Sequence, residues 1–372
     1  MTDIVDVGLR VDSSDVKSGK KNLAGLGKQA GRTQRATEKM SAAFKVGVVA
    51  ALAAATAAMW KTIAVHREFT KTISELSAIT GATGKDLRFY SDEARRLGAT
   101  TTFSASQVAE AFKLVASAKP ELLDSSQALA GVTQEVLKLA EASGLQMPEA
   151  AKALGGALNQ FGAGADEASR FINVLAAGSK FGASEINNTA EAMKNVGSVA
   201  SSIGLSFEET NAALQTLASV SIKSSEAGTG LRGALLKLVK QSNSQFNPEV
   251  VGLTKAFQNL SAANLSTQQR MEIFGQESIT AASALIEQAD SLDELTGKLT
   301  GTNVAYEQAR INTDNLDGDI KQMNSSWSNA ALIIGDTFDP ALRFVTQLLG
   351  DVGRVVSSLA IALKDIGDAF GA

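Results

Sequence analysis

Three glycines, Gly228, Gly230 and Gly233, form the pattern in this sequence that comes nearest to a known binding chemistry. They spell G-x-G-x-x-G, the pattern of a dinucleotide-binding loop in which the backbone approaches a pyrophosphate. Such a loop must follow a β-strand, but residues 214–220 have the spacing of a helix end, and no strand follows at βαβ spacing. We therefore predict no cofactor here. The glycines are expected to allow close helix packing at a tight turn.

Paired carboxylates are the next candidates, because two acids held at the right separation can hydrolyse glycosides. Glu208 and Glu209 form one pair, and Asp317 and Asp319 form another. The first pair follows Ser206 into the first turn of a predicted helix, where negative charge is favourable for structural reasons. With no cysteine and a single histidine, His66, the common catalytic triads and zinc sites are also excluded. No catalytic, cofactor or metal residue is assigned, and we predict that the protein is not an enzyme.

The composition favours helices over strands. The chain of 372 residues has 4 prolines, and only 5% of its residues are aromatic. Because an interior proline costs a helix about 3 kcal/mol, this scarcity permits long helices, with a thin core of Ala, Leu, Val and Phe. The net charge of −4 predicts no specific nucleic-acid recognition.

The first 67 residues differ from the rest of the chain. Ile4–Asp12 alternates apolar and polar residues, which predicts a short β-strand. Residues 16–45 then carry eight basic side chains and one acidic one, as in a solvated basic helix or a docking arm for an acidic partner or nucleic acid. Val46–Trp60 is uncharged and rich in alanine. It is expected to pack against copies of itself, and a membrane span is the alternative.

From Asp86 to Leu238 the sequence predicts a series of short helices, each with one buried face. Capping boxes begin helices after Ser104, Ser206 and Ser266, Asp124 shows a similar pattern, and Pro148 fits a first turn. Glycines are expected to separate the helices at Gly98, Gly144, Gly162–Gly164, Gly182 and Gly204. These short connections favour antiparallel neighbours in a compact helical domain.

The last part of the chain has longer helical patterns. A helix from Ser266 is predicted to end at Gly275, and an amphipathic stretch follows at Asn312–Gly335. Ala341–Phe370 then carries apolar residues at steps of three and four. That apolar face needs a partner: a membrane surface, another copy, or a continuation of the chain.

Two ordered blocks of sequence carry a family resemblance. Ala94–Ala111 reads ARRLGATTTFSASQVAEA, and Ser219–Leu235 reads SVSIKSSEAGTGLRGAL. With Gly204–Thr210 between them and Ile273-Phe274-Gly275 after them, the chain resembles the core domain of phage tail tape measure proteins, the phage minor tail protein domain. The residues that match the motifs, expected to act in packing, are Gly98, Ala99, Thr100, Thr101, Phe103, Ala227, Gly228, Leu231 and Arg232.

The chain departs from this family at two turns. The family commonly has glycine where this chain has Ser221 and Ser224, and an Ala-Gly phrase where it has Ala118-Lys119. These turns are expected to be stiffer here. Typical members are longer, so we expect a short or split member, a prophage remnant, or part of a longer chain.

The resemblance implies a structural role without catalysis. Such a protein is an elongated, oligomeric helical scaffold in the lumen of a phage tail tube. Tube subunits polymerise around it with the help of chaperones, its length sets tail length, and it leaves the tube during genome delivery. The implied partners are the tail tube protein, tail assembly chaperones, further copies of itself, and the host membrane during ejection. The implied locations are the virion tail and, during assembly, the host cytoplasm.

We therefore predict an all-α protein: a multi-helix core with flanking long amphipathic helices and a short N-terminal strand. The expected parts are residues 1–67 (strand, basic arm and Ala-rich helix), 68–300 (core) and 301–372 (amphipathic helical region). A membrane-active helical protein, such as a pore or channel component, is the alternative, because Val46–Trp60 and Ala341–Phe370 are apolar.

Overall fold

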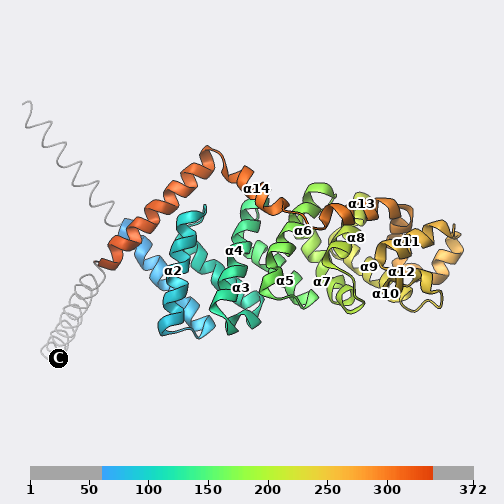
Figure 1. Cartoon of the computed structure of the whole chain (residues 1–372), viewed down its shortest axis with the longest axis horizontal. Coiled ribbons are helices and arrows are strands. Elements are labelled where there is room, and N and C mark those ends of the chain that lie inside the picture. The colour runs from blue at the N-terminus through green and yellow to red at the C-terminus, as the bar shows by residue number, and fades with distance from the viewer. Residues whose placement is uncertain (1–60, 338–372) are drawn as a thin grey trace, which may run out of the picture. The chain divides into compact units, whose positions relative to one another are not determined.

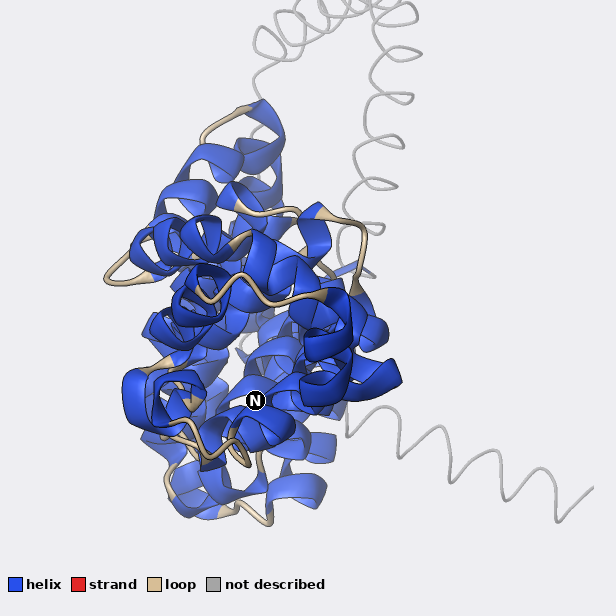
Figure 2. Ribbon diagram, turned by 90° about the vertical axis from the view of Figure 1, so that its right-hand side faces the viewer, coloured by secondary structure: helices blue, strands red, loops and turns tan. Residues whose placement is uncertain are grey.

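The computed structural model describes residues 61–337, and these residues form helices and loops without a β-strand (Figure 2). The chain divides by its contacts into residues 1–61 and 62–372, and the second unit is described here by itself. The prediction of an all-α protein is confirmed for the described residues. The expected strand at Ile4–Asp12 and the segments Val46–Trp60 and Ala341–Phe370 lie outside them.

Helices occupy residues 61–80 and 316–337 at the two ends of the described chain. Between them lie α2 (Gly84–Thr100), α3 (Ala105–Ala118), α4 (Ser126–Ser143), α5 (Met147–Phe161), α6 (Ala168–Phe181), α7 (Ile186–Ser202), α8 (Phe207–Ser219), α9 (Ser224–Leu238), α10 (Pro248–Val251), α11 (Leu253–Ala262), α12 (Thr267–Glu287), α13 (Ala289–Leu299) and α14 (Val304–Thr313). Single 3₁₀ turns occur at Pro120–Asp124, Ala165–Glu167 and Ser244–Phe246.

The helices pack in an order that goes out and comes back. Contacts link α2 to α3, α3 to α5, α5 to α7, α7 to α9 and α9 to α12. The chain then returns, because α13 packs on α8 and α6, and α14 packs on α6 and α4 (Figure 1). The helix at 316–337 ends the return beside α2. Segments far apart in sequence therefore share one core.

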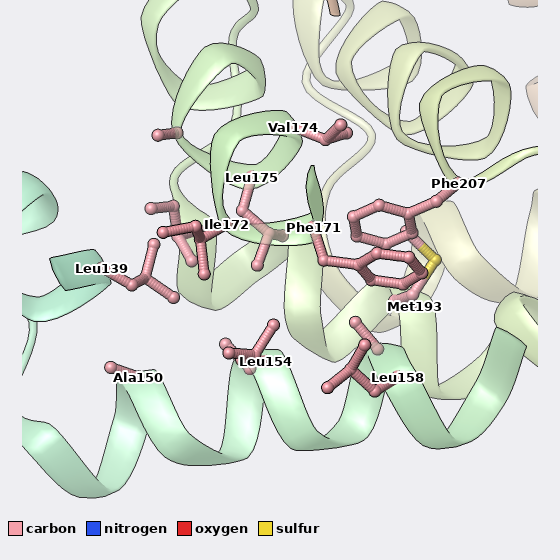
Figure 3. Packing of buried hydrophobic residues seen from close by; sticks show 14 of the residues in the cluster. Leu139, Ala150, Leu154, Leu158, Phe171, Ile172, Val174, Leu175, Met193 and Phe207 are labelled. Atoms are coloured by element: carbon pink, nitrogen blue, oxygen red, sulfur yellow. The ribbon is translucent and has the colours of Figure 1, made fainter. Parts of the chain in front are cut away.

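The core is built from Ala, Leu, Val and Phe, as the composition predicts. At its middle Phe171 of α6 stacks on Phe207 of α8, with ring centroids 4.2 Å apart and planes 9° from parallel. Phe161 at the end of α5 meets both rings edge-on. Leu154 and Leu158 of α5 close this layer from the other side (Figure 3). These three rings therefore join α5, α6 and α8 at one point of the core.

The predicted helix starts are mostly confirmed. Ser104, Ser206 and Ser266 each form a complete capping box, and Pro148 lies in the first turn of α5. The prediction at Asp124 is wrong by one residue. Asp124 ends a 3₁₀ turn, and Ser125 caps α4 by accepting a hydrogen bond from the Ala128 amide.

The glycine joints are confirmed except at Gly98. Gly144, Gly162 and Gly204 follow helices with positive φ, and Gly182 follows α6 in an extended conformation. Gly98 instead lies inside α2. Glycine is needed there because the start of α3 is so close that a Cβ would lie 2.7 Å from the Ala105 nitrogen. Gly275 has non-helical angles within α12, which agrees with the break predicted there.

Two further expectations need revision. Helix α8 is buried on almost all sides, because α6, α7, α9, α12 and α13 surround it. The amphipathic stretch expected at Asn312–Gly335 is two helices, with α14 ending at Thr313 and the next helix beginning at residue 316. Among residues 61–337, every helix is too short or too polar to cross a lipid bilayer.

Candidate functional site

The first family block forms the corner between α2 and α3. Thr101 stabilises the end of α2 by donating to the Leu97 carbonyl at 2.8 Å, and its hydroxyl accepts from the Phe103 amide at 3.3 Å. A residue near the end of the described part of the chain also binds this corner. The Ser325 hydroxyl contacts the carbonyl oxygens of both Gly98 and Phe103, the latter at 2.6 Å.

The exposed residues of this corner have smaller roles. Ala99 and Thr100 face solvent, while Thr102, two residues further on, binds α4. Both the backbone amide and the hydroxyl of Thr102 donate to Glu141 Oε1, at 3.1 and 3.0 Å. The block therefore fixes the positions of α2, α3 and α4 through backbone groups as well as apolar packing.

The second block lies within and just before α9. A Cβ at Gly228 would overlap the Ala192 carbonyl of α7, one at Gly230 would lie 2.7 Å from Ala281 Cβ, and one at Gly233 would overlap the Ser278 hydroxyl. The glycines therefore let α7 and α12 approach α9 closely. The tight turn expected at these glycines is not there, since all three lie inside the helix.

Ala227 and Leu231 are buried on the same helix. Arg232 is exposed, and within residues 61–337 its side chain makes no hydrogen bond or ion pair. A dinucleotide site is excluded by the local geometry, because α8 and not a strand precedes the motif.

A tight turn does occur just before α9, at Ser221 and Ser224, where the resemblance led us to expect glycine. Ser221 has φ of 68° and Ser224 has φ of 54°, the left-handed region that favours glycine. Ser221 follows α8 in a Schellman motif: its amide binds the Ala218 carbonyl at 3.0 Å, and the Ile222 amide binds the Leu217 carbonyl at 3.1 Å. Lys119, by contrast, has φ of −139°, which any residue adopts.

The two blocks do not meet in one site. The first packs around α2, α3 and α4, and the second packs between α7 and α12, with α5 and α6 between them (Figure 1). Each block is a place where backbones approach closely. Gly98, Thr101, Phe103, Ala227, Gly228 and Leu231 therefore lie at close contacts in two separate places of one core, whereas Ala99, Thr100 and Arg232 are exposed.

Three of the four candidate catalytic acids make structural contacts, and the fourth, Asp319, is exposed. Glu208 is buried and accepts both its hydrogen bonds from Arg170 of α6, each at 2.7 Å. Glu209 completes the capping box of α8 and accepts from the Leu253 amide at 3.3 Å. Asp317 pairs with Lys321 at 2.6 Å on an exposed helix face.

A buried polar cluster inside α6, α7 and α8 was not predicted from the sequence. Gln215 donates to Thr189 at 3.0 Å and accepts from the Ser184 amide at 2.7 Å, while Asn211 donates to the Val174 carbonyl at 2.9 Å. The signal for it was the run of polar residues on α8, which looked like a solvent face. Because its hydrogen bonds are made internally, the cluster fixes the helices in position.

A second unpredicted cluster joins three helices. The Tyr306 hydroxyl of α14 donates to Glu135 of α4 at 2.7 Å and lies 2.9 Å from the Ser169 hydroxyl of α6. Burial raises the pKa of the Glu135 carboxyl, although the Tyr306 hydrogen bond opposes this, and burial likewise raises the pKa of Tyr306. No sequence spacing links residues 135, 169 and 306, so only the folded chain brings them together.

An open cavity of about 790 Å³ lies where the α2–α3 corner meets α14 and the helix at 316–337. Its wall combines Phe103, Leu145 and Ile311 with Glu141 and Asn312. Glu141 is already bound by Thr102, and the Asn312 amide donates to the Ala142 carbonyl at 2.8 Å. His66 is buried away from this cavity, 3.6 Å from Asp336. Within residues 61–337, no cluster of His, Asp or Glu side chains could hold a metal ion.

The geometry thus defines a class: an all-helical domain in which most of the motif residues lie at close contacts between helices. The sequence matches the family described as "Phage-related minor tail protein" over residues 91–314, more than half of the chain. The protein belongs to this family of phage tail proteins, and the predicted resemblance is confirmed.

Two curated relatives give a finer comparison. The tape measure protein of Pneumococcus phage Dp-1 is 31% identical over 82% of this chain and 28% of its own length. The probable tape measure protein of Escherichia phage P2 is 30% identical over 86% of this chain and 42% of its own length. The chain therefore spans less than half the length of either relative. No solved structure matches it significantly.

Proposed function

We propose that this protein acts as a tape measure protein, a scaffold that sets tail length while the tail tube assembles and that leaves the tube when the genome is delivered. The observation that carries the proposal is the similarity to two tape measure proteins over 82% and 86% of the chain. It is supported by the structural contacts of Glu208, Glu209 and Asp317, since a scaffold needs packing surfaces and no chemistry.

The proposed partners follow from this role. They are the tail tube protein, tail assembly chaperones and further copies of the chain, with the host membrane as a contact during ejection. The proposed locations are the tube lumen in the virion and the host cytoplasm during assembly. The division into residues 1–67, 68–300 and 301–372 stays a prediction. No catalysis, cofactor or specific nucleic-acid recognition is part of the proposal.

A genetic experiment in the parent phage tests the role. A stop codon early in the gene should give particles without normal tails, and the intact gene supplied in trans should restore them. An in-frame helical insertion after residue 337 should lengthen the tail by about 1.5 Å for each inserted residue. Electron microscopy measures both outcomes. Infectious virions with tails of unchanged length from both mutants would contradict the proposal.

A further inference from the structure

The helix at residues 316–337 has two unlike faces. One face is docked on α2 through Ser325, Asn329 and Asp336: the Asn329 amide donates to the Arg95 carbonyl at 2.9 Å, and Arg95 binds Asp336 at 2.6 Å. Leu332 on this face is fully buried. The docked face is thus mostly polar, which is unusual for the inner side of a helix.

The opposite face is apolar and open to solvent. Trp327 is 69% exposed and Leu316 is 74% exposed, although large apolar side chains are usually buried. The members of this face, called the seam below, are Leu316, Ile320, Met323, Trp327, Ala330 and Ile334; all are exposed except Ala330, which is half-buried. Among residues 61–337, no other helix exposes so many large apolar residues in a row.

The spacing of the seam indicates what kind of surface covers it. Successive members are four, three, four, three and four residues apart, the a and d spacing of a coiled coil. Ile320, Trp327 and Ile334 take one heptad position, and Leu316, Met323 and Ala330 take the other. An apolar stripe made only of a and d positions is narrow and fits the side of one other helix. A helix that lies on a broad surface has a wider apolar face.

The charges around the seam disfavour a lipid surface as its partner. Helices that lie on membranes carry Lys and Arg beside the apolar face. Residues 316–337 hold Asp317, Asp319 and Asp336 against one basic residue, Lys321. An anionic lipid surface would repel this helix, whereas a narrow apolar seam can pair with another helix of the same pattern.

The sequence beyond residue 337 supplies a further argument for a copy of the same chain. The alternating steps of three and four resume there, at Leu342, Val345, Leu349, Val352, Val356, Leu359 and Leu363. Two chains aligned along one seam would therefore meet a matching apolar pattern on both sides of Asp339-Pro340. We propose that Leu316–Ile334 is a self-association surface, which pairs with the same helix of a second copy.

This inference deepens the self-association part of the proposed function, and it is tested in vitro so that its failure leaves the tail-length role standing. The full chain is purified and its mass is measured by sedimentation at several concentrations. The wild type should form a multiple of the 38.6 kDa chain. The double variant Ile320→Glu/Trp327→Glu should bind itself at least about a hundredfold more weakly, because two large apolar contacts are lost.

A matched control uses another exposed apolar residue. Val250 on α10 is 62% exposed, so Val250→Glu should leave the mass unchanged. Because Ile320 and Trp327 are exposed, the double variant should also keep the wild-type unfolding temperature of the core, which separates lost association from misfolding.

A second readout uses the absence of cysteine from the chain. A single Ala330→Cys change should give a disulfide-linked dimer under mild oxidation, and Val250→Cys should not. A wild-type chain that is still monomeric at a concentration of about 100 μM would have a dimer Kd well above that value. This result would overturn the inference. So would multimers unchanged by the double variant, or binding to anionic vesicles that needs the seam without any self-association.

Discussion

Two serines occupy backbone positions that suit glycine better. Ser221 and Ser224 both have positive φ, on either side of the turn from α8 to α9. In this region the Cβ approaches the following carbonyl oxygen, which costs roughly 1 kcal/mol for a residue other than glycine. The strain is local, and it lies at the two positions of this turn where the resemblance led us to expect glycine.

We predict that Ser221→Gly and Ser224→Gly each raise the free energy of unfolding by about 0.5–1 kcal/mol, because they remove this strain. Chemical denaturation of the purified chain measures the change. The control is Ser225→Gly, one residue further into α9, which should lower stability because glycine weakens a regular helix and the bond from Asn195 to the Ser225 hydroxyl is lost. Equal effects at positions 221 and 225 would contradict the prediction.

At the scale of elements, glycines set how closely helices approach. Gly228 meets the Ala192 carbonyl of α7, so its missing Cβ is occupied by backbone that cannot move aside. Gly131 is also inside a helix, α4, but its missing Cβ would meet nothing within 4 Å. Both glycines are therefore interior helix residues, but only Gly228 has another helix against the position of its missing Cβ.

Opposite outcomes are therefore expected for one chemical change. Gly131→Ala should stabilise the protein by about 0.5–1 kcal/mol, because alanine is the better helix former. Gly228→Ala should destabilise it by about 1–3 kcal/mol, and Gly228→Val by more, because α7 and α9 must separate. Thermal unfolding measures all three variants. Stabilisation by Gly228→Ala would show that the close approach has no energetic weight.

At the scale of the whole molecule, the returning helices bind to helices that come much earlier in the sequence. The Tyr306–Glu135 contact joins α14 to α4 across 171 residues of sequence. The raised pKa of Glu135 means that the folded state holds a proton there more tightly than the unfolded state. Stability from this group is fully present below the ordinary pKa of 4.5, and it is lost as the pH rises through the higher folded value.

Glu135→Gln should remove this dependence, since glutamine keeps an acceptor for Tyr306 without a buried charge. The variant should unfold at a higher temperature than the wild type at pH 7, and the gap should close as the pH falls to 4. Comparing the two proteins at each pH cancels the titration of the other acids. A gap that stays constant with pH would contradict the role given to Glu135.

The sequence determined much of the local structure. Capping boxes at Ser104, Ser206 and Ser266 specify helix starts through groups three residues apart, so sequence spacing alone predicts them. The two family blocks likewise indicated the family, because their order and separation lie within the sequence. The helical class follows from the scarcity of proline and the apolar period.

The tertiary structure decided what the exceptions mean. Gly98 and the three glycines of α9 looked like joints or a turn, because glycine is common in both. Each instead lies inside a helix, close to the backbone or a side chain of another helix. The polar face of α8 looked exposed and is buried, since hydrogen bonds to α6 and α7 satisfy it. At residues 316–334 the amphipathic pattern did not show which face would be packed, and the apolar seam is largely exposed because Ser325 and Asn329 dock the other side. A periodic pattern fixes which residues share a face of a helix, but only long-range contacts decide which face is turned inward.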